Sequence, residues 1–317
     1  GSILPFHFLF VEFLKNTVEP KSGLKQPERA PNLAHRGNRP MAEYKRTAFY
    51  DLHVALGARM VPFGGWEMPV LYSGIAQEHH AVRQAAGLFD ISHMGEFLFD
   101  GPDALKFLNQ LLTNDLAKLE PGQGQYTLLC QEDGGVIDDL YAYRLGDTRH
   151  LLIVNASRLE IDWMWIKAQR NSRHKSLQLE MTDLSGDLAA MALQGPKAAE
   201  IIANVFPAAV ELLKNQIAEL DFGRATAWVS RTGYTGEDGF EISVAAGDAE
   251  RLARLFLEHP RVLLAGLGAR DSLRLEAGPC LSGTDIDAGT TPIEAGLAWI
   301  VAKKHRAPAA VPAFSGA

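Results

Sequence analysis

The sequence predicts an α+β fold in which mainly antiparallel sheets are flanked by helices. Apolar strand patterns over residues 126–130 and 136–145 are separated only by the short turn Glu132–Gly135, as in a β-hairpin. Amphipathic helical patterns alternate with such strands along the chain. The same order of elements recurs in the second half, although the halves share too little sequence to prove a duplication. A doubly wound parallel sheet is disfavoured because its strands are joined by long crossovers and not by hairpins.

Local patterns justify each further element of the first half. Residues 74–87 carry apolar and small side chains at helical spacing, and residues 102–113 repeat this pattern with four leucines after an initial proline. Residues 150–155 form another apolar strand. Ser157 and Glu160 have the spacing of a capping box, which predicts a helix from there to about residue 169.

The second half alternates in the same way. Residues 188–193 have a strand pattern, and Gly195-Pro196 begins a predicted helix that runs to about residue 204. Two further strand patterns surround a glycine-rich loop, and two helical patterns follow: strands at 224–231 and 240–245, helices at 247–258 and 268–277.

Composition excludes several classes of protein. The chain has 317 residues, a formal charge of −7 and 47% hydrophobic residues, which is ordinary for a globular protein. The acidic balance disfavours a large nucleic-acid surface. The apolar run at residues 3–14 is shorter than the roughly 20 residues that a membrane span needs, and it lacks the basic segment of a signal peptide. We therefore expect neither nucleic acid nor membrane as a partner.

A break in composition at Met41 suggests how the chain is divided. We expect residues 1–40 to be a disordered or mis-assigned N-terminal extension, because they are polar and proline-rich after the apolar run. Residues 41–185 would form a first α+β domain and residues 186–301 a second one. Residues 302–317 have the composition of a linker.

Cysteine and histidine give little support for a metal site. Cys130 and Cys280 are too few for a disulfide framework, and their apolar surroundings favour buried, reduced thiols in a cytoplasmic setting. His79, His80 and His93 are the best candidate ligands, but adjacent helix positions point about 100° apart. No metal is therefore expected.

The pair Asp138-Asp139 is the first candidate for chemistry. It lies inside an apolar strand, where neighbouring side chains point to opposite faces. Burial of a carboxylate is costly unless it is hydrogen-bonded. Taken alone, the pair is most simply interpreted as acidic residues of a turn near the surface. Tyr126 and Asn155, at the ends of the adjacent strands, add polar groups to the same sheet, although Asn155 could simply cap the next helix.

A second polar group gathers in the other half. Tyr234 lies in a loop unusually rich in glycine and polar residues, and such loops often carry binding residues. Glu241 follows on the next strand, pointing opposite to its apolar neighbours. Arg270 lies in the first turn of a predicted helix. A structural ion pair between Glu241 and a basic residue is an equally good interpretation.

Six sequence motifs resemble those of one known family, the glycine cleavage T proteins, which are aminomethyltransferases. They occur in the family's order between about residues 45 and 301: GWEMP (65–69), GLFDISHMGE (87–96), LTND (112–115), GGVIDDL (134–140), RTGYTGEDGFE (231–241) and GLGARDSLRLEA (266–277). The resemblance implies the T-protein folate-binding fold, with two related domains.

The resemblance also implies a reaction and its partners. A lipoylated carrier, the H protein, brings an aminomethyl group on its dihydrolipoyl sulfur. The T protein passes the one-carbon unit to tetrahydrofolate, giving 5,10-methylenetetrahydrofolate, ammonia and the reduced carrier. Tetrahydrofolate is a co-substrate, and no metal is required. The expected location is the bacterial cytoplasm, or the mitochondrion in a eukaryote.

Matching the motifs residue by residue assigns roles by resemblance. Asp139 corresponds to the essential acid near folate N5 and N10, where it would stabilise a developing cation as ammonia leaves. Five further residues match folate-pocket positions: Tyr126, Asn155, Tyr234, Glu241 and Arg270. Among them, Glu241 matches the acid that binds the donor edge of the pterin, and Arg270 the associated pocket arginine.

The chain departs from the family pattern in two places. Ser282 stands where the family commonly has tyrosine, and Pro279 precedes Cys280. The chain also stops where the family's C-terminal β-barrel begins, so we expect that barrel, which usually supplies a further arginine to the folate site, to be absent.

Two other functions are alternatives. One is a folate-dependent demethylase of the same fold, against which the motif spelling and the lack of a preceding flavin domain argue. The other is a non-catalytic folate-binding module. Its relatives carry a Lys-Gly-Cys-Tyr-Thr-Gly-Gln-Glu motif, whereas the corresponding stretch here, Arg-Thr-Gly-Tyr-Thr-Gly-Glu-Asp at 231–238, lacks that cysteine, which favours the enzyme.

Overall fold

The computed structural model describes residues 44–303. The extension predicted at 1–40 and most of the linker predicted at 302–317 lie outside the described residues. Among the residues described, no helix is both long enough and apolar enough to cross a bilayer.

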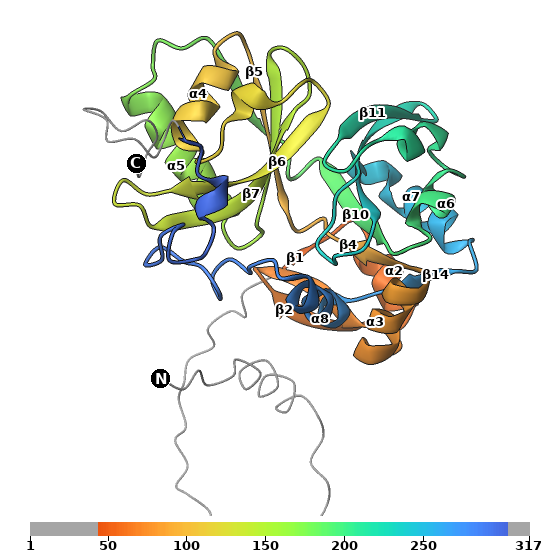
Figure 1. Cartoon of the computed structure of the whole chain (residues 1–317). Helices are drawn as coiled ribbons and strands as arrows, with labels where there is room; N and C mark the ends of the chain where they lie inside the picture. Colours follow the sequence, from red (N-terminus) through yellow and green to blue (C-terminus); the bar gives the residue numbers. More distant parts are fainter. Residues whose placement is uncertain (1–43, 304–317) are drawn as a thin grey trace, which may run out of the picture. The chain divides into compact units, whose positions relative to one another are not determined.

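A five-stranded antiparallel sheet occupies the middle of the described chain (Figure 1). Its strands, in the spatial order β6-β7-β8-β5-β9, are β5 (Gly95–Asp100), β6 (Gln123–Cys130), β7 (Val136–Arg144), β8 (Arg149–Val154) and β9 (Glu180–Asp183). Helices α4 (Ala104–Leu111) and α5 (Leu159–Ser172), with the short η1 (Leu116–Lys118), bury their apolar stripes against one face. That face forms one of the hydrophobic cores.

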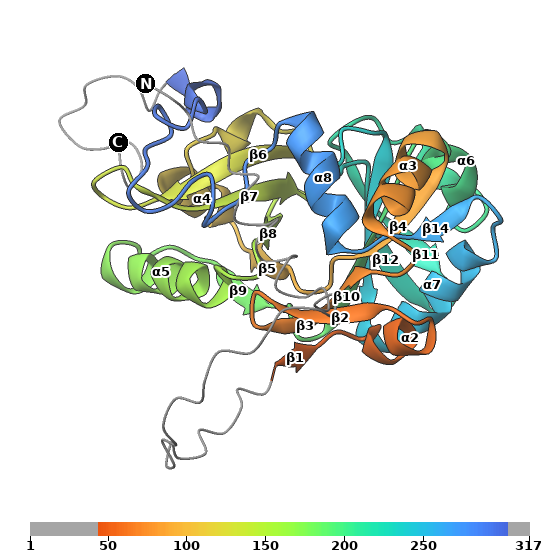
Figure 2. The ribbon, with the colours of Figure 1, turned by 90° about the horizontal axis from the view of Figure 1, so that it is seen from below.

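A six-stranded sheet forms the second layer, in the order β11-β12-β13-β10-β4-β14. Its strands are β4 (Ala86–Asp90), β10 (Leu188–Gln194), β11 (Ile217–Phe222), β12 (Ala225–Ser230), β13 (Gly239–Ala245) and β14 (Val262–Leu264). The elements α2 (Tyr50–Ala55), α6 (Ala198–Ile202), η2 (Pro207–Glu211), η3 (Ala246–Asp248) and α7 (Ala249–Leu257) contribute to the core on one face. Helices α3 (Ile75–Gln84) and α8 (Leu267–Ala277) lie side by side on the other (Figure 2).

Two smaller features complete the described fold. A three-stranded sheet has the order β1-β3-β2 and contains β1 (Lys45–Arg46), β2 (Arg59–Phe63) and β3 (Trp66–Leu71). The segment 280–301, with the short helix η4 (Ala298–Ile300), packs Ile286, Leu297 and Ile300 against β6 and β7.

Glu78 of α3 joins the turn after β3 to the start of α8. Its side chain is fully buried, and Oε1 accepts the backbone N–H groups of Tyr72 (2.7 Å), Ser73 (2.8 Å) and Gly74 (3.1 Å). Oε2 accepts the backbone N–H of Gly266 (2.9 Å), the residue before α8. One buried carboxylate therefore satisfies four backbone donors and fixes the start of the helix that carries Arg270.

The predicted fold class is confirmed, since among the described strands only β1–β3 and β4–β14 pair in parallel. Two local predictions were wrong. The helix expected over 74–87 ends at Gln84, because the chain enters strand β4 at Ala86. The capping box of Ser157 and Glu160 does not form, because the N-cap of α5 is Arg158 and it makes no side-chain cap hydrogen bond.

The sheets do not divide the chain at residue 185. Strand β4, from the stretch 41–185, pairs with β10 inside the second sheet. The division into domains at 41–185 and 186–301 stays a prediction about folding units, whereas the hydrogen-bonded sheets interleave the two stretches.

Candidate active site

Strand alternation presents a polar row on the face of the five-stranded sheet that α4 and α5 leave free. Asp139 pairs with Leu128, and Tyr141 pairs with Tyr126, so these four residues share one face. The segment 280–301 covers part of that face. The exposed ring of Trp299 stacks on Tyr126, with ring centroids 6.2 Å apart.

Asp139 is held by a hydrogen bond on each carboxyl oxygen. The Tyr126 hydroxyl donates to Oδ2 over 2.9 Å, and the Asn155 side-chain amide donates to Oδ1 over 3.1 Å. The same amide nitrogen also lies 2.8 Å from the backbone carbonyl of Asp139. The sequence-predicted residues Tyr126, Asn155 and Asp139 are therefore brought together, with the carboxylate fixed from both sides.

The surroundings of Asp139 place its titration near neutrality. Burial and the charge of Asp138 together raise the pKa of Asp139 to about 7, against the hydrogen bonds from Tyr126 and Asn155, which act to lower it. A carboxyl group with such a pKa can be charged or can hold a proton at physiological pH. It suits a role that combines stabilisation of a cation with proton transfer.

Tyr234 and Arg270 form the next part of the site. The Tyr234 hydroxyl donates to the Cys280 carbonyl over 2.6 Å, and the Arg270 guanidinium lies 4.6 Å from the centroid of the Tyr234 ring. Burial, with a smaller contribution from the charge of Asp139, raises the pKa of Tyr234 to about 12. The charges of Arg270 and Arg274 act to lower it. Tyr234 therefore connects the surroundings of Asp139 to those of Arg270.

Glu241 lies across from these groups, on the face of β13 opposite the core residues Phe240 and Ile242. Its carboxylate accepts the Thr232 hydroxyl over 2.7 Å. No ion pair within 4.0 Å joins Glu241 to Arg270 in the part of the chain that is described, although the charge of Glu241 raises the pKa of Arg270, which burial lowers. Arg270 Nη1 is buried without a hydrogen-bond partner among the residues described.

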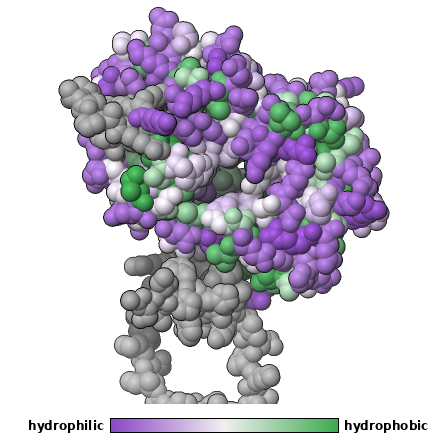
Figure 3. Space-filling model, in the orientation of Figure 1, coloured by the Kyte–Doolittle hydropathy of each residue, from purple (hydrophilic) through white to green (hydrophobic). Residues whose placement is uncertain are grey.

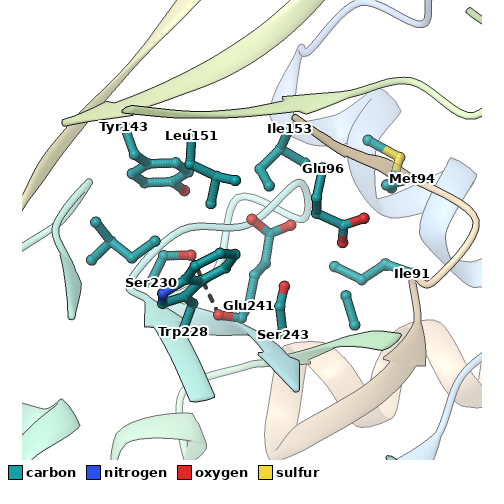
Figure 4. A pocket seen from close by; sticks show the side chains of 12 residues that line it. Ile91, Met94, Glu96, Tyr143, Leu151, Ile153, Trp228, Ser230, Glu241 and Ser243 are labelled. Atoms are coloured by element: carbon teal, nitrogen blue, oxygen red, sulfur yellow. Dashed lines mark hydrogen bonds between the residues drawn. The ribbon is translucent and has the colours of Figure 1, made fainter. Parts of the chain in front are cut away.

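A pocket opens between the two large sheets beside Glu241 (Figure 4). The side chains of Glu96 and Glu241 both point into it from opposite sheets. Burial and the charge of Asp183 raise the pKa of Glu96 to about 8. The other lining residues are mostly apolar or aromatic: Ile91, Met94, Tyr143, Leu151, Ile153, Ala190, Ile217, Trp228, Ser230 and Ser243. Apolar walls with a few oriented acceptors are typical of a small-molecule site that binds N–H donors.

The surface is hollowed near the centre of the face seen in Figure 1. Figure 3 shows this hollow between the parts of the chain that carry β7 and β10. Within the described residues, no group of three or more His, Cys, Asp or Glu side chains is arranged to hold a metal ion. Buried His93, considered as a ligand, instead packs its ring edge-on against Phe63.

Sequence reasoning missed two residues of this region. Asp162 of α5 is fully buried behind Asp138, and its spacing from Leu159 and Ile166 places it on the apolar stripe of the helix. That spacing was a usable signal. Glu96 could have been found from its place between apolar residues of an alternating strand, since Phe97 and Phe99 face the core.

Comparisons with known proteins identify the family. Residues 49–305 match the family model described as the GCVT N-terminal domain. An aminomethyltransferase of Symbiobacterium thermophilum is 49% identical over 270 residues, which cover 82% of this chain and 71% of the relative. One of Bacillus subtilis is 44% identical over 267 residues, covering 83% and 72%.

A solved structure gives the same result for the fold. The glycine cleavage system aminomethyltransferase T from Bartonella henselae superposes with a TM-score of 0.77 at 41% identity, covering 83% of this chain and 70% of that one. The family model spans most of the chain, and the relatives exceed 40% identity over more than two thirds of their length. The chain therefore belongs to the aminomethyltransferase family of the glycine cleavage system.

Proposed function

We propose that the face around Asp139 transfers a one-carbon unit from the aminomethylated lipoyl arm of an H protein to tetrahydrofolate. Family membership supports the reaction class. The observation that carries the proposal is the fixed carboxylate of Asp139, which hydrogen bonds from Tyr126 and Asn155 orient on the sheet face that α4 and α5 leave free. The bacterial relatives and the reduced cysteines favour the cytoplasm as the location.

The atoms of the proposed reaction balance with the groups present. The carbon of the aminomethyl group loses its bonds to sulfur and to nitrogen, and gains bonds to N5 and N10 of tetrahydrofolate. The two hydrogens released from N5 and N10 go to the departing ammonia and to the dihydrolipoyl thiol. A positive charge develops on this carbon, and an ionised Asp139 would stabilise it. A carboxyl group with a pKa near neutrality can also accept one of the released protons.

The remaining residues suit the binding of a pterin. Its amino and amide N–H groups match the acceptor oxygens of Glu241, and its flat rings match the apolar and aromatic pocket walls. Arg270 has a buried N–H group without a partner, which an acceptor atom of the ligand would satisfy. The fit rests on donor and acceptor chemistry of these side chains.

Tetrahydrofolate binding tests the site independently of turnover. Tryptophan fluorescence is suitable because Trp228 lines the pocket and Trp299 lies against Tyr126. We expect saturable quenching with the wild-type chain. The variant Arg270→Leu, which removes the unsatisfied donor, should bind at least about tenfold more weakly. Equal affinity of both proteins would remove Arg270 from the proposed pocket, and no saturable binding to the wild type would contradict the proposed substrate.

A further inference from the structure

A second acid lies behind the strand that carries Asp139. Asp138, the preceding residue, points to the opposite face of β7, where α5 covers the sheet. Asp162 of α5 reaches the same place. Both side chains are completely buried, at 0% exposure. Two buried acids side by side require an explanation, because each would be costly as an isolated charge.

Asp138 accepts two hydrogen bonds from Asn155. Its Oδ2 accepts the backbone N–H of Asn155 over 3.0 Å, and its Oδ1 accepts the side-chain amide over 3.0 Å. Both contacts use Asp138 oxygens as acceptors, which suits an ionised carboxylate because it carries no proton of its own to place. Asp138 therefore sets the orientation of the amide that also donates to Asp139 Oδ1.

Asp162 has a different set of neighbours. Neither of its carboxyl oxygens meets an N–H or hydroxyl donor among the residues described. Its hydrogen-bonding neighbour is the carboxyl group of Asp138. Two acids can bind each other only if one of them keeps a proton, as in carboxyl pairs that share a site.

The surrounding charges indicate which acid keeps the proton. Burial and the charge of Asp138 raise the pKa of Asp162 to about 10, with a smaller contribution from Asp139. Arg158 opposes this shift, but its Nε–H is committed to the Ile137 carbonyl over 2.8 Å. Burial also raises the pKa of Asp138, but the hydrogen bonds from the backbone and side chain of Asn155 act in the opposite direction and favour its charged form. The proton of the pair therefore belongs on Asp162.

We propose that Asp162 is a positioning residue, a neutral carboxylic acid that donates its proton in a hydrogen bond to Asp138. Asp138 then accepts hydrogen bonds from the backbone N–H and the side-chain amide of Asn155, and that amide orients Asp139. The catalytic consequence rests on the proposed function, whereas the protonation of Asp162 does not. Asp162 contacts no substrate in this arrangement.

Two uncharged variants of similar size separate the hydrogen bond from the filling of space. Asp162→Asn keeps a neutral group with an N–H donor, and Asp162→Leu fills the space without a donor. We expect Asp162→Leu to lower kcat at least about tenfold, with the KM for tetrahydrofolate within about twofold of the wild type. Asp162→Asn should restore kcat to within about threefold. Equal losses in the two variants, or no loss in Asp162→Leu, would overturn the positioning role.

Infrared spectroscopy reads the proton without any turnover. At a pH of about 8, below the pKa of about 10, the wild type should show an additional carbonyl band of a protonated carboxylic acid that Asp162→Asn lacks, above the signal that Glu96, with its pKa of about 8, gives in both proteins. If the two spectra agree in this band, the proposal fails. The side-chain amide resonances of Asn155 in NMR should shift in Asp162→Leu and stay in Asp162→Asn.

The two measurements distinguish a failure of this inference from a failure of the proposed function. A wild-type chain that shows the infrared band and the Asn155 shifts, but transfers no carbon to tetrahydrofolate, would contradict the proposed function alone. A wild-type chain that transfers carbon but lacks the band would contradict the inference alone.

Discussion

Replacement of Asp139 by asparagine removes one negative charge and changes little else. The side chain keeps its size, and Tyr126 and Asn155 remain in place to contact it. A cation about 4 Å from a carboxylate gains about 4 kcal/mol at an effective dielectric constant of about 20. That energy corresponds to a factor of roughly 10³ in rate. Since the loss of one oriented electrostatic group typically costs about 10²–10³, we expect kcat to fall by that amount.

The assay is the formation of methylenetetrahydrofolate from aminomethylated H protein. The matched control is Asp147→Asn, because Asp147 lies in the turn after β7 and its side chain is 91% exposed. This control makes the same chemical change without touching the site, so its kcat should equal that of the wild type. Strand alternation predicted that Asp138 faces away from Asp139. Asp138→Asn is nevertheless unsuitable as a neutral comparison, because the Asp138 carboxylate accepts two hydrogen bonds from Asn155. A loss below about threefold in Asp139→Asn, or an equal loss in Asp147→Asn, would refute the electrostatic role.

Three further predictions follow from the same contacts. Glu241→Ala should weaken tetrahydrofolate binding at least about tenfold by calorimetric titration, because a hydrogen bond to a charged group is worth about 1.5–3 kcal/mol. The control Glu219→Ala, at an exposed position of β11, should leave the affinity unchanged. A lowered melting temperature with unchanged affinity would show that Glu241 is structural. The kcat should rise with pH through about 7, because the raised pKa of Asp139 means that its charged form appears only as that pH is passed; a flat profile from pH 6 to about 8 would contradict this role. Glu78→Ala should lower the unfolding free energy by at least about 3 kcal/mol in urea titrations, because four buried backbone donors lose their acceptor. The control Glu250→Ala, at an exposed position of α7, should change it by less than about 0.5 kcal/mol. Similar losses in both variants would show that the donors find other partners.

The hairpin around Asp139 was predictable because its signals are local. Apolar runs separated by a turn with two glycines specify β6 and β7, and Gly134 adopts a positive φ of 92° in that turn. The alternation within β7 also correctly indicated that Asp138 and Asp139 face opposite sides. The helices α5, α7 and α8 were found within a few residues for the same reason, since their apolar stripes recur at helical spacing.

Other elements depend on partners far along the chain. Strand β4 was read as the end of a helix, because Ala86 and Gly87 extend the pattern of α3. Its pairing with β10, about 100 residues later, decides the outcome. The contact of Asp162 with Asp138 likewise joins a helix to a strand across a packed layer, so the sequence shows an acid on an apolar stripe without showing its partner.

The six candidate residues show the same difference between local sequence signals and contacts that only the fold creates. Residue chemistry and strand alternation suggested acids and tyrosines on one face, and resemblance gave each a role. Only the fold shows that Tyr234 is near both Asp139 and Arg270, and that Glu241 points into a pocket shared with Glu96. The roles of Asp139, Tyr126, Asn155, Tyr234, Glu241 and Arg270 stay predictions.

The most direct test of the account follows a carbon label from donor to acceptor. The wild-type chain is mixed in a single turnover with H protein that carries a ¹³C-labelled aminomethyl group and with tetrahydrofolate, and the label is followed by NMR. The account predicts that the label appears in methylenetetrahydrofolate together with one equivalent of ammonia, at a rate far above that without the chain. If the label stays on the H protein, or reaches tetrahydrofolate no faster than in the chain's absence, the proposed transfer is contradicted.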